Sequence, residues 1–535
     1  MRPPFAGFLA LAASLTAPAA PATAAATSEI APAKAPSGLF QLPGGNAVDL
    51  CVLDRLRAEG IPPSEACSDA TFLRRVHLDL TGTLPTTNEA RAFLADKSRN
   101  KRAELVERLL ASEAYADYWA MKWSDWLRVK SEFPSNLWPN AVQSYHKWLR
   151  DRMRDNTPYD RFARELLTAT GSNFRSPPAN FLRAFQERTP RALAENVALV
   201  FMGVRADNPA LAARFGPGFH AFFAQLGYKN TDEWKEEIVF HDPGAALKDA
   251  SGAPVPPTFP DGRRAALAPG ADPREAFVDW LTAPGNPWFA RAVVNRLWAC
   301  HFGRGLVHEP DDFRPDNPAW SPALLNLLER ELLTHRYDLR HIHRIILNSE
   351  TYRRSSTPNA WNRDDAFGFS HYRLRRLEAE TVVDAICLIT GGTEKYTSSI
   401  PEPFTYLPDN QKAVAIADGS IVSPFLETFG RPARNTSFDS ERSNTPSSIQ
   451  AQYLLNSTNI QQKLARSGPI RRLASGKLTP EQIAEELYLR ILSRTPTPAE
   501  SEIAAAHLTA GKKSHEAVCD LAWALINTKE FILKH

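Results

Sequence analysis

The sequence predicts a mainly α protein made of two packed multi-helical domains with a small β insertion between them. Apolar residues recur at helical spacing from Ala47 to about Asn208, and again from about Arg264 onwards. Between these stretches, residues 209–262 hold an alternating run and turn-rich sequence, which favours a short β hairpin. The 42 prolines against 26 glycines also favour many helix starts and stiff connections.

The composition is that of a globular protein without a dominant charge. The chain has 535 residues, of which 43% are hydrophobic and 23% charged, and its net charge is +3. This balance does not select nucleic acid as a partner. Neither Cys-x-x-Cys nor Cys-x-x-Cys-His occurs, so we expect no metal and no bound cofactor. Cys51 and Cys67 are close enough in sequence for a small bridge, which the sequence leaves open.

The chain begins with a segment that is typical of export. Arg2 precedes the apolar run FAGFLALAASL and small-residue Ala-x-Ala sites, so residues 1–26 are predicted to be a secretory signal peptide. Residues 27–46, rich in Ala, Pro, Ser and Gly, are predicted to be a disordered tether. Since no later run is long enough to span a membrane, we expect a soluble protein of the periplasm or cell surface.

The N-terminal helical domain is expected to span residues 47–208. Thr87 is the predicted cap of an amphipathic helix, and the polar loop GSNFRSPPANFLRA at 171–184 fits either a binding loop or a cap over a helix end. The twelve tryptophans fit core contacts or a sugar-stacking surface. Three of them recur at steps of four and three, which predicts a buried helix face: Trp119, Trp123 and Trp126.

The C-terminal helical domain is expected to span residues 263–535. It includes a long irregular segment at 393–444, and such segments tend to be functional or held by many polar contacts. It also includes residues 286–356, where the residue types of a buried polar site are crowded.

The candidate catalytic residues are Asp311, Asp312 and His343. Adjacent carboxylates can differ in pKa, as acid–base catalysis requires. Consecutive residues in an extended loop point apart, however, so these aspartates fit equally well as helix caps or partners of arginine. A metal site that joins His301 and His308 with His341 or His343 is a further option, but no fixed metal-ligand spacing supports it. His343 is more typical of a buried helix face.

The candidate binding residues share polar side chains that either pair internally or line an open cleft. Arginine holds carboxylates well, so an open cleft would suit an acidic or sulfated ligand. These candidates are Asn295, Arg296, Arg314, Arg431, Arg434, Glu441 and Arg442.

Four stretches carry a resemblance to a known family: FLRRVHLDLTGTLPT, NPWFARAVVNRLWACHFGRGLVHEPDDFR, FGRPARNTSFDSERSNTPSSIQAQYLLN and WALINTKEF. Together they resemble the paired domains of unknown function found in secreted proteins of planctomycete-type bacteria, often fused to planctomycete-type cytochrome c domains. The resemblance runs from about Ala47 to the end. It implies export, a mostly helical body, and an association with haem or redox domains and with exported hydrolases.

The chain departs from these relatives where they carry cysteines. Many relatives have Cys-x-x-Cys-His after the equivalent of Phe201–Arg205, and a Cys-x-Cys before the later Glu-Arg. Here Phe438 and Ser440 occupy the second pair of positions. By the resemblance, this member lacks the haem or metal site.

The preferred hypothesis is an exported accessory or binding protein that is linked to polysaccharide handling. Its expected partners are exported hydrolases or an acidic polysaccharide. One alternative is a secreted hydrolase that uses Asp311 or Asp312 in an arginine-lined cleft, although no G-x-S-x-G, P-loop, zinc or Rossmann motif is present. The other is a redox-associated protein whose haem site has been lost.

Overall fold

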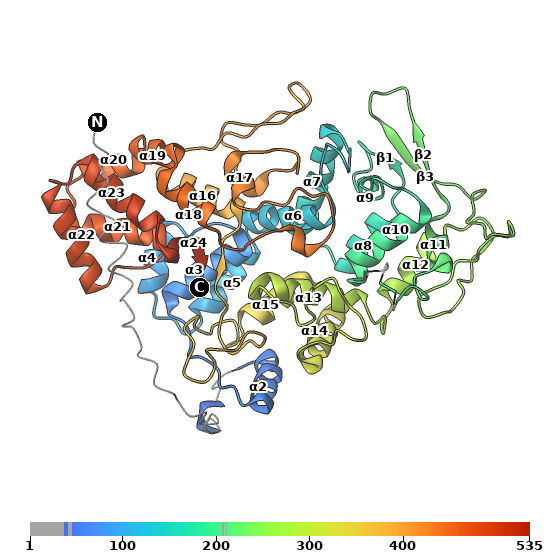
Figure 1. Ribbon diagram of the computed structural model, residues 1–535, viewed down its shortest axis with the longest axis horizontal. Helices are drawn as coiled ribbons and strands as arrows, with labels where there is room; N and C mark the ends of the chain where they lie inside the picture. Colours follow the sequence, from blue (N-terminus) through green and yellow to red (C-terminus); the bar gives the residue numbers. More distant parts are fainter. Residues whose placement is uncertain (1–36, 41–44, 206–207, 210) are drawn as a thin grey trace.

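The computed structural model describes residues 37–40, 45–205, 208–209 and 211–535. The predicted signal peptide at 1–26 and most of the predicted tether at 27–46 lie outside these residues. The described chain forms an elongated body of helices, with its longest strands near one end (Figure 1). The prediction of a mainly α protein is confirmed.

Polar caps start most helices of the first part of the chain. Thr86, and not Thr87, caps α4, because the Glu89 side chain returns to the Thr86 backbone and closes a capping box. The helices are α2 (Ala47–Glu59), α3 (Asp69–Thr81), α4 (Thr87–Ala95), α5 (Lys101–Leu110), α6 (Glu113–Trp126), α7 (Pro139–Arg154), α8 (Tyr159–Leu167), α9 (Ala179–Arg183) and α10 (Pro190–Val197).

A small antiparallel sheet has the order β1 (Gly171–Ser172), β3 (Glu237–His241), β2 (Leu226–Asn230). Strands β2 and β3 form a hairpin within residues 209–262. Gly227 permits the close pairing, because a Cβ there would lie 2.5 Å from the Phe240 ring.

Side-chain caps start most of the remaining helices, which are α11 (Pro217–His220), α12 (Pro273–Thr282), α13 (Phe289–Phe302), α14 (Pro322–Thr334), α15 (Leu339–Leu347), α16 (Ala379–Thr390), α17 (Pro424–Thr428), α18 (Ser448–Asn456), α19 (Thr458–Ala465), α20 (Gly468–Ser475), α21 (Pro480–Leu492), α22 (Pro498–Ala510), α23 (His515–Ile526) and α24 (Lys529–Ile532). A second pairing joins β4 (Arg375–Arg376) to β5 (Leu533–Lys534). The end of the chain therefore returns to the centre of the molecule.

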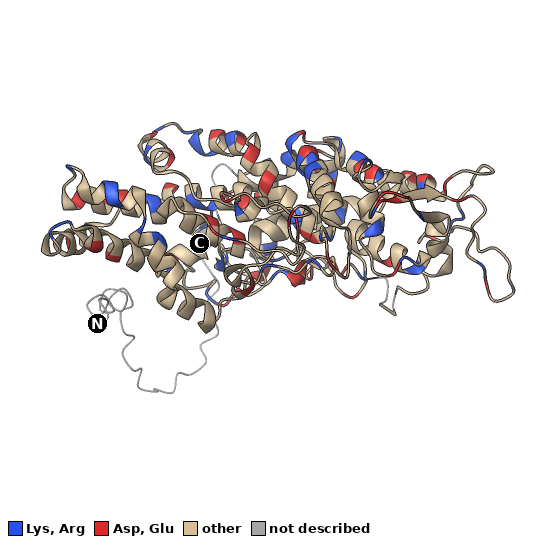
Figure 2. Ribbon diagram, turned by 90° about the horizontal axis from the view of Figure 1, so that it is seen from above, with Lys and Arg blue, Asp and Glu red and all other residues tan. Residues whose placement is uncertain are grey.

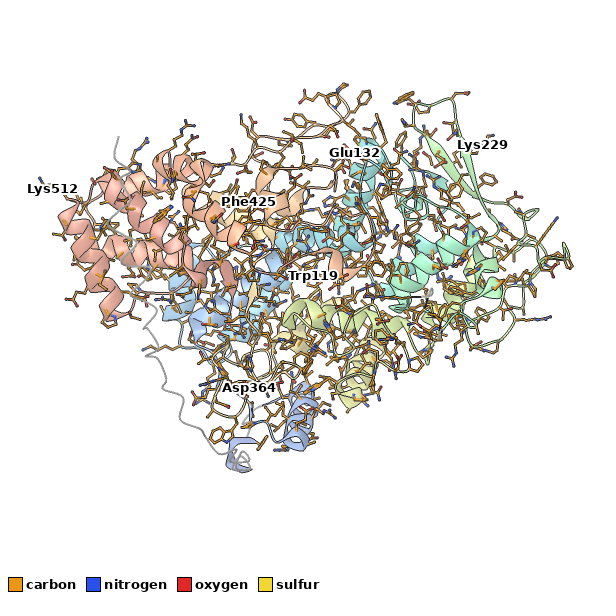
Figure 3. The ribbon with its side chains drawn as sticks, in the orientation of Figure 1. Trp119, Glu132, Lys229, Asp364, Phe425 and Lys512 are labelled. Carbon is orange, nitrogen blue, oxygen red and sulfur yellow. The ribbon has the colours of Figure 1, made fainter. Side chains whose placement is uncertain are left out.

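The apolar side chains form two cores. The larger core extends from α2 through α15 and contains the tryptophan face predicted on α6, with Trp119 at the centre of the molecule (Figure 3). The smaller core is built mainly from α16 to α24. Basic and acidic residues are interleaved along the body (Figure 2). In the described part of the chain, no helix is long and apolar enough to cross a membrane.

Candidate functional site

The loop that follows α13 is shaped by one buried asparagine. Asn295 donates through Nδ2 to the carbonyl of Val307 at 2.9 Å and to that of Pro310 at 3.3 Å, and its Oδ1 accepts from the Val307 N–H at 3.0 Å. Gly305 is needed in this tight loop, because a Cβ there would lie 2.2 Å from the Val307 carbonyl oxygen. The side-chain amide of Asn295 thus forms its hydrogen bonds within the protein.

The guanidinium of Arg296 also has its partners within the protein. It donates to the carbonyls of Leu199, at 2.8 Å, and Val200. It lies 5.4 Å from the centre of the Trp126 ring, within the range of a cation–π contact. Arg296 therefore connects α13 to the short π-helix Ala198–Met202.

The two adjacent aspartates engage different partners. Asp311 is fully buried and accepts from Arg205 at 2.9 Å and from the backbone N–H of Asp439 at 3.3 Å. Asp312 forms an ion pair with Arg314 at 3.1 Å. Each carboxylate is paired with a guanidinium, so neither is an unpaired base.

A cluster of arginines joins the long irregular segment to two helices. Arg442 donates to Asp125 of α6 and to Glu380 of α16, each at 2.7 Å. Arg434 donates to the other Asp125 oxygen at 2.9 Å, and Arg431 lies 3.4 Å from Glu380. Burial acts to raise the pKa of Glu380, but the charges of Arg442 and Arg431 and the Arg442 hydrogen bond together outweigh it and lower the pKa. The acidic partners of these arginines thus come from α6 and α16, not from the loop after α13.

Glu441 holds the backbone of the same segment. Its carboxylate accepts from the N–H groups of Asn435 at 2.8 Å and Thr436 at 2.9 Å. Arg434 in turn donates to the carbonyl of Ala417 at 2.6 Å. Together with the ion pairs, these bonds fix a segment that has little regular structure.

His343 lies apart from the aspartates in a buried aromatic layer. Its Nδ1 is 2.8 Å from Nε2 of His301, and its ring centre is 4.3 Å from that of Trp119. Burial holds the pKa of His343 well below its usual value, so the ring is neutral at neutral pH. His343 is placed to fill the interior rather than to meet a ligand beside Asp311.

The layer around His343 continues to Asp79 of α3. Asp79 accepts from Tyr352 at 2.7 Å and from Lys534 of β5 at 2.5 Å, and it lies 4.0 Å from His301. Burial acts to raise the pKa of Asp79, but Lys534, His301 and Arg375 together outweigh it and hold the pKa well below the usual range. A buried ion pair therefore joins α3 to β5, far apart in the sequence.

The sequence patterns did not single out Asp79, Asp125 or Glu380. Asp79 and Asp125 have apolar or aromatic neighbours, in LDL and WSDW, although their helices also carry other carboxylates. Because a charge on a buried helix face is costly without a partner, those neighbours are the signal that could have marked a buried ion pair. No comparable signal marks Lys534 near the end of the chain.

A pocket of about 420 Å³ opens between the loop after α13 and residues 439–445. Arg304 and Arg442 line it, as do Glu309, Asp439 and Cys300. Arg304 rests on an aromatic ring, and in the described part of the chain no carboxylate lies within ion-pair distance of it.

Burial raises the pKa of two acidic groups in this pocket. Burial raises the pKa of the Asp439 carboxyl, whose oxygen accepts from Trp126 Nε1 at 3.2 Å. Burial also raises the pKa of the Cys300 thiol to about 12, so a thiolate is disfavoured there. All five cysteines are free, and the bridge considered between Cys51 and Cys67 does not form.

A second open region is aromatic. Three rings from distant segments meet at one edge and form what we term the aromatic surface: Trp138, Trp234 and Phe404. The centre of the Trp138 ring lies 6.4 Å from that of Trp234 and 5.3 Å from that of Phe404. Trp234 is 66% exposed and Phe404 is 42% exposed. The β2–β3 hairpin and the loop before α17 rise along the same edge as Glu132 (Figures 1 and 3).

The polar loop at 171–184 positions the hairpin that carries Trp234. Asn173 donates to the carbonyl of Lys235 at 3.1 Å and accepts from the N–H of Glu237 at 3.0 Å. Arg183 donates to the Glu237 carboxylate at 2.6 Å. These side chains thus hold the hairpin rather than the end of a helix.

Family models match two parts of the chain. The model PSCyt2, described as a protein of unknown function (DUF1549), matches residues 47–207. The model PSD1, described as a protein of unknown function (DUF1553), matches residues 273–508. The chain carries both domains of this pair. In comparisons with curated proteins and with solved structures, nothing matches.

The arginine cluster lies across the boundary between the two domains. Asp125 belongs to the PSCyt2 part, whereas Glu380, Arg434 and Arg442 belong to the PSD1 part. The stretch FGRPARNTSFDSERSNTPSSIQAQYLLN therefore contacts α6 and α16 inside the molecule. Their contacts join the two domains into one body.

Proposed function

We propose that this chain is an exported binding protein that holds polysaccharide on its aromatic surface. The observation that carries this proposal is the meeting of Trp138, Trp234 and Phe404 at one exposed edge. Sugar rings present apolar C–H faces that stack on aromatic rings. Exposed aromatic groups that cluster in this way are typical of contact sites for ligands or partners.

The charges around the aromatic surface support contact with sugars that carry acidic groups. The Lys235 ammonium lies 5.0 Å from the centre of the Trp138 ring and 5.4 Å from that of Trp234. A carboxylate or sulfate on a bound sugar would meet a cation there. Asp232 and Glu233 on the same turn carry negative charges, opposite to that of Lys235. The proposal therefore rests on the faces of the aromatic rings and not on the net charge of the turn.

Affinity electrophoresis of the full chain through gels that contain neutral, uronate-rich or sulfated polysaccharides tests the proposal. We expect at least one polysaccharide to retard the wild-type protein. Trp234→Ala should weaken the apparent affinity at least about tenfold, since loss of an aromatic anchor costs more than about 1 kcal/mol at a binding site. Lys235→Gln should weaken binding to the acidic polysaccharides alone.

Trp361→Ala provides the matched control, because Trp361 is another exposed tryptophan, at 45%, in a different segment. This variant should migrate as the wild type does. Equal loss of retardation in the Trp234 and Trp361 variants would count against the aromatic surface. Free migration of the wild-type protein through every gel would remove the proposed function.

A second candidate function, that of a hydrolase, is favoured by Asp439 rather than by Asp311 or Asp312. A carboxyl whose pKa is raised by burial, at the wall of a pocket of about 420 Å³, has the property of a general acid. Glu309, in the same pocket, supplies a second carboxylate.

Release of reducing sugar from the polysaccharide panel tests this candidate. If the wild-type protein has such an activity, Asp439→Asn should lower kcat by about 100-fold or more, as expected for loss of acid–base catalysis. Asp316→Asn, at an exposed carboxylate, should leave the rate unchanged. A wild-type protein without activity on the whole panel would exclude this candidate.

A further inference from the structure

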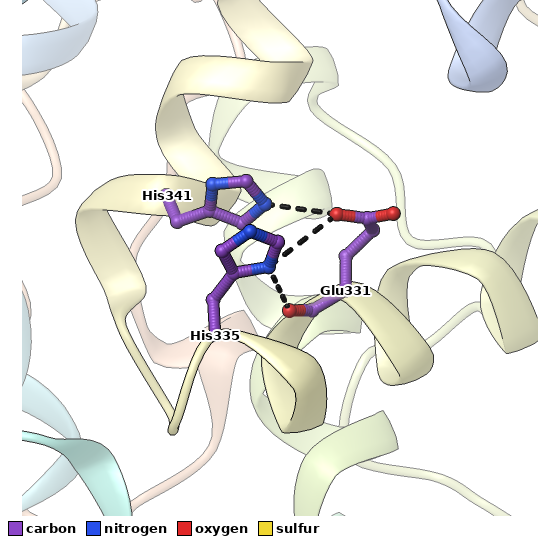
Figure 4. A group of neighbouring side chains, drawn as sticks. All are labelled: Glu331, His335 and His341. Carbon is purple, nitrogen blue, oxygen red and sulfur yellow. Dashed lines mark hydrogen bonds and ion pairs between the residues drawn. The ribbon is translucent and has the colours of Figure 1, made fainter.

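Two histidines and a glutamate converge at the corner between α14 and α15 (Figure 4). One ligand atom from each of Glu331, His335 and His341 lies within 4.8 Å of the other two. Nε2 of His341 is 2.9 Å from Oε2 of Glu331, and Nδ1 of His335 is 3.6 Å from the same oxygen. The two imidazole rings are stacked, with their centres 3.5 Å apart.

The fold holds these three side chains at one corner. Glu331 and His335 are four residues apart, so they share a face at the end of α14. The chain then reverses through a turn in which the N–H of Tyr337 donates to the carbonyl of Leu332 at 2.8 Å. Asp338 caps α15 by accepting from the N–H of His341 at 3.1 Å. The turn therefore fixes His341 opposite the end of α14.

The electrostatic surroundings favour a cation. Within the described residues, the Glu331 carboxylate is paired with the two imidazoles and with no arginine or lysine. The side chains of His335 and Glu331 are 45% and 30% exposed, so an ion can enter from solvent.

We propose that Glu331, His335 and His341 bind a zinc ion, with one coordination position left open to solvent. Imidazole nitrogen and carboxylate oxygen are regular zinc ligands, and three protein ligands leave the fourth tetrahedral position free. Ligand atoms in such a geometry lie about 3.3 Å apart, given zinc–nitrogen distances of about 2.0–2.1 Å. The spacings from Oε2 of Glu331 to the two histidine nitrogens, 2.9 and 3.6 Å, bracket this value.

Zinc binding replaces two existing hydrogen bonds. Nδ1 of His335 lies 2.9 Å from the carbonyl oxygen of Glu331, and Nε2 of His341 lies 2.9 Å from the Glu331 carboxylate. The zinc ion takes the place of the protons in these two hydrogen bonds. A small tilt of the stacked imidazole rings would direct Nδ1 of His335 and Nε2 of His341 at the ion. Because the ligands come from two helices, the bound ion would also clamp the α14–α15 turn.

Titration calorimetry of the full chain, free of any histidine tag, with zinc chloride tests the site. We expect one zinc ion per chain to bind at this corner. His335→Ala, His341→Ala and Glu331→Gln should each weaken the affinity at least about tenfold, as loss of a metal contact does. Because the His335 side chain is 45% exposed, its variant should keep the fold. His241→Ala, at a histidine bonded to Gln225 on the hairpin, is the matched control and should bind zinc as the wild type does.

Cobalt(II) and thermal unfolding provide independent readouts. Bound cobalt(II) should give the visible absorption bands of a four-coordinate site. Zinc should raise the temperature at which half of the wild-type protein is unfolded. Both signals should be absent from the double variant His335→Ala/His341→Ala. The proposal is overturned if the wild type binds no zinc, or if the double variant and the wild type bind zinc equally, which would place the ion elsewhere.

Discussion

The buried arginine cluster and the aromatic surface differ in whether their groups already have partners. In the cluster, Arg442 and Arg434 are bound by Asp125 and Glu380 inside the protein. On the aromatic surface, Trp234 remains 66% exposed. The arginines of the irregular segment are thus paired with carboxylates of α6 and α16. The exposed aromatic surface lies in segments that are less conspicuous in sequence.

This difference predicts opposite responses to mutation. An intact buried ion pair contributes little net stability, because its attraction is offset by desolvation, but removal of one partner leaves a buried charge alone. Removal of an exposed aromatic ring leaves no buried group without a partner, because the ring is already in contact with water. Stability should therefore fall with mutations in the cluster and stay constant with mutations on the aromatic surface.

The largest effect is expected for Arg442→Ala. Loss of this guanidinium removes the only residue that bridges Asp125 and Glu380 directly within the described chain. The free energy of unfolding should fall by about 3 to 5 kcal/mol, the usual cost of breaking a buried pair from one side. Urea unfolding followed by tryptophan fluorescence measures this change.

Arg161→Ala is the control for that experiment. Arg161 pairs with Glu165 four residues on, but its side chain is 68% exposed. Loss of such a surface pair should cost about 0.5 kcal/mol or less. If the Arg442 and Arg161 variants lose similar stability, the buried cluster does not join the two domains as we infer.

A smaller loss is expected for Asn295→Ala. This change leaves the N–H and carbonyl of Val307 and the carbonyl of Pro310 without their partner. Buried polar groups without a partner should lower the free energy of unfolding by about 2 to 3 kcal/mol. Asn140→Ala, at an exposed position of α7, should have no measurable effect in the same assay, and an equal loss in both variants would contradict this role.

The sequence predicted the helices better than the roles of the polar residues, and the reason is physical. Helical spacing and caps are local, so the buried tryptophan face of α6 could be recognised from a few neighbouring residues. The partners of Arg442 lie more than three hundred residues away at Asp125 and some sixty residues away at Glu380. Only the fold decides whether such an arginine meets a carboxylate or a cleft.

The aromatic surface shows the same limit. Tryptophans were expected either in the core or on a sugar-stacking surface, and the structure has both buried and exposed indoles. The helical spacing around Trp119 marks its buried face, but no local pattern around Trp234 shows that it lies beside Trp138. The hairpin, the loop before α17 and the start of α7 have to be brought together before Trp138 acquires its two neighbours.

An intermediate effect is expected when the pH is lowered. His146 of α7 is buried, and burial, together with the nearby charge of Arg434, lowers its pKa to about 3. A histidine in the unfolded chain titrates near pH 6.5, so the stability from the neutral ring is complete above that pH and is lost as the pH falls toward 3. At pH 5 the loss is about 2 kcal/mol, from ~1.36 kcal/mol per pH unit over about 1.5 units.

Urea unfolding at pH 7.5 and pH 5 checks this expectation. The free energy of unfolding of the wild type should be lower at pH 5. In His146→Gln, which cannot take up a proton, the difference between the two pH values should shrink by about 2 kcal/mol. An unchanged difference would mean that His146 is protonated in the folded protein at pH 5.

The smallest effect on stability is expected for Trp234→Ala. Most of this indole is already in contact with water, and the turn that carries it is held by backbone bonds from Asn173 and by the β2–β3 pairing. The free energy of unfolding should therefore change by no more than about 0.5 kcal/mol, as for other surface substitutions. A larger loss would show that the indole supports the hairpin, and weaker retardation by polysaccharide would then reflect a displaced turn. Unchanged stability together with lost retardation would assign Trp234 to ligand contact, the property that separates the aromatic surface from the buried cluster.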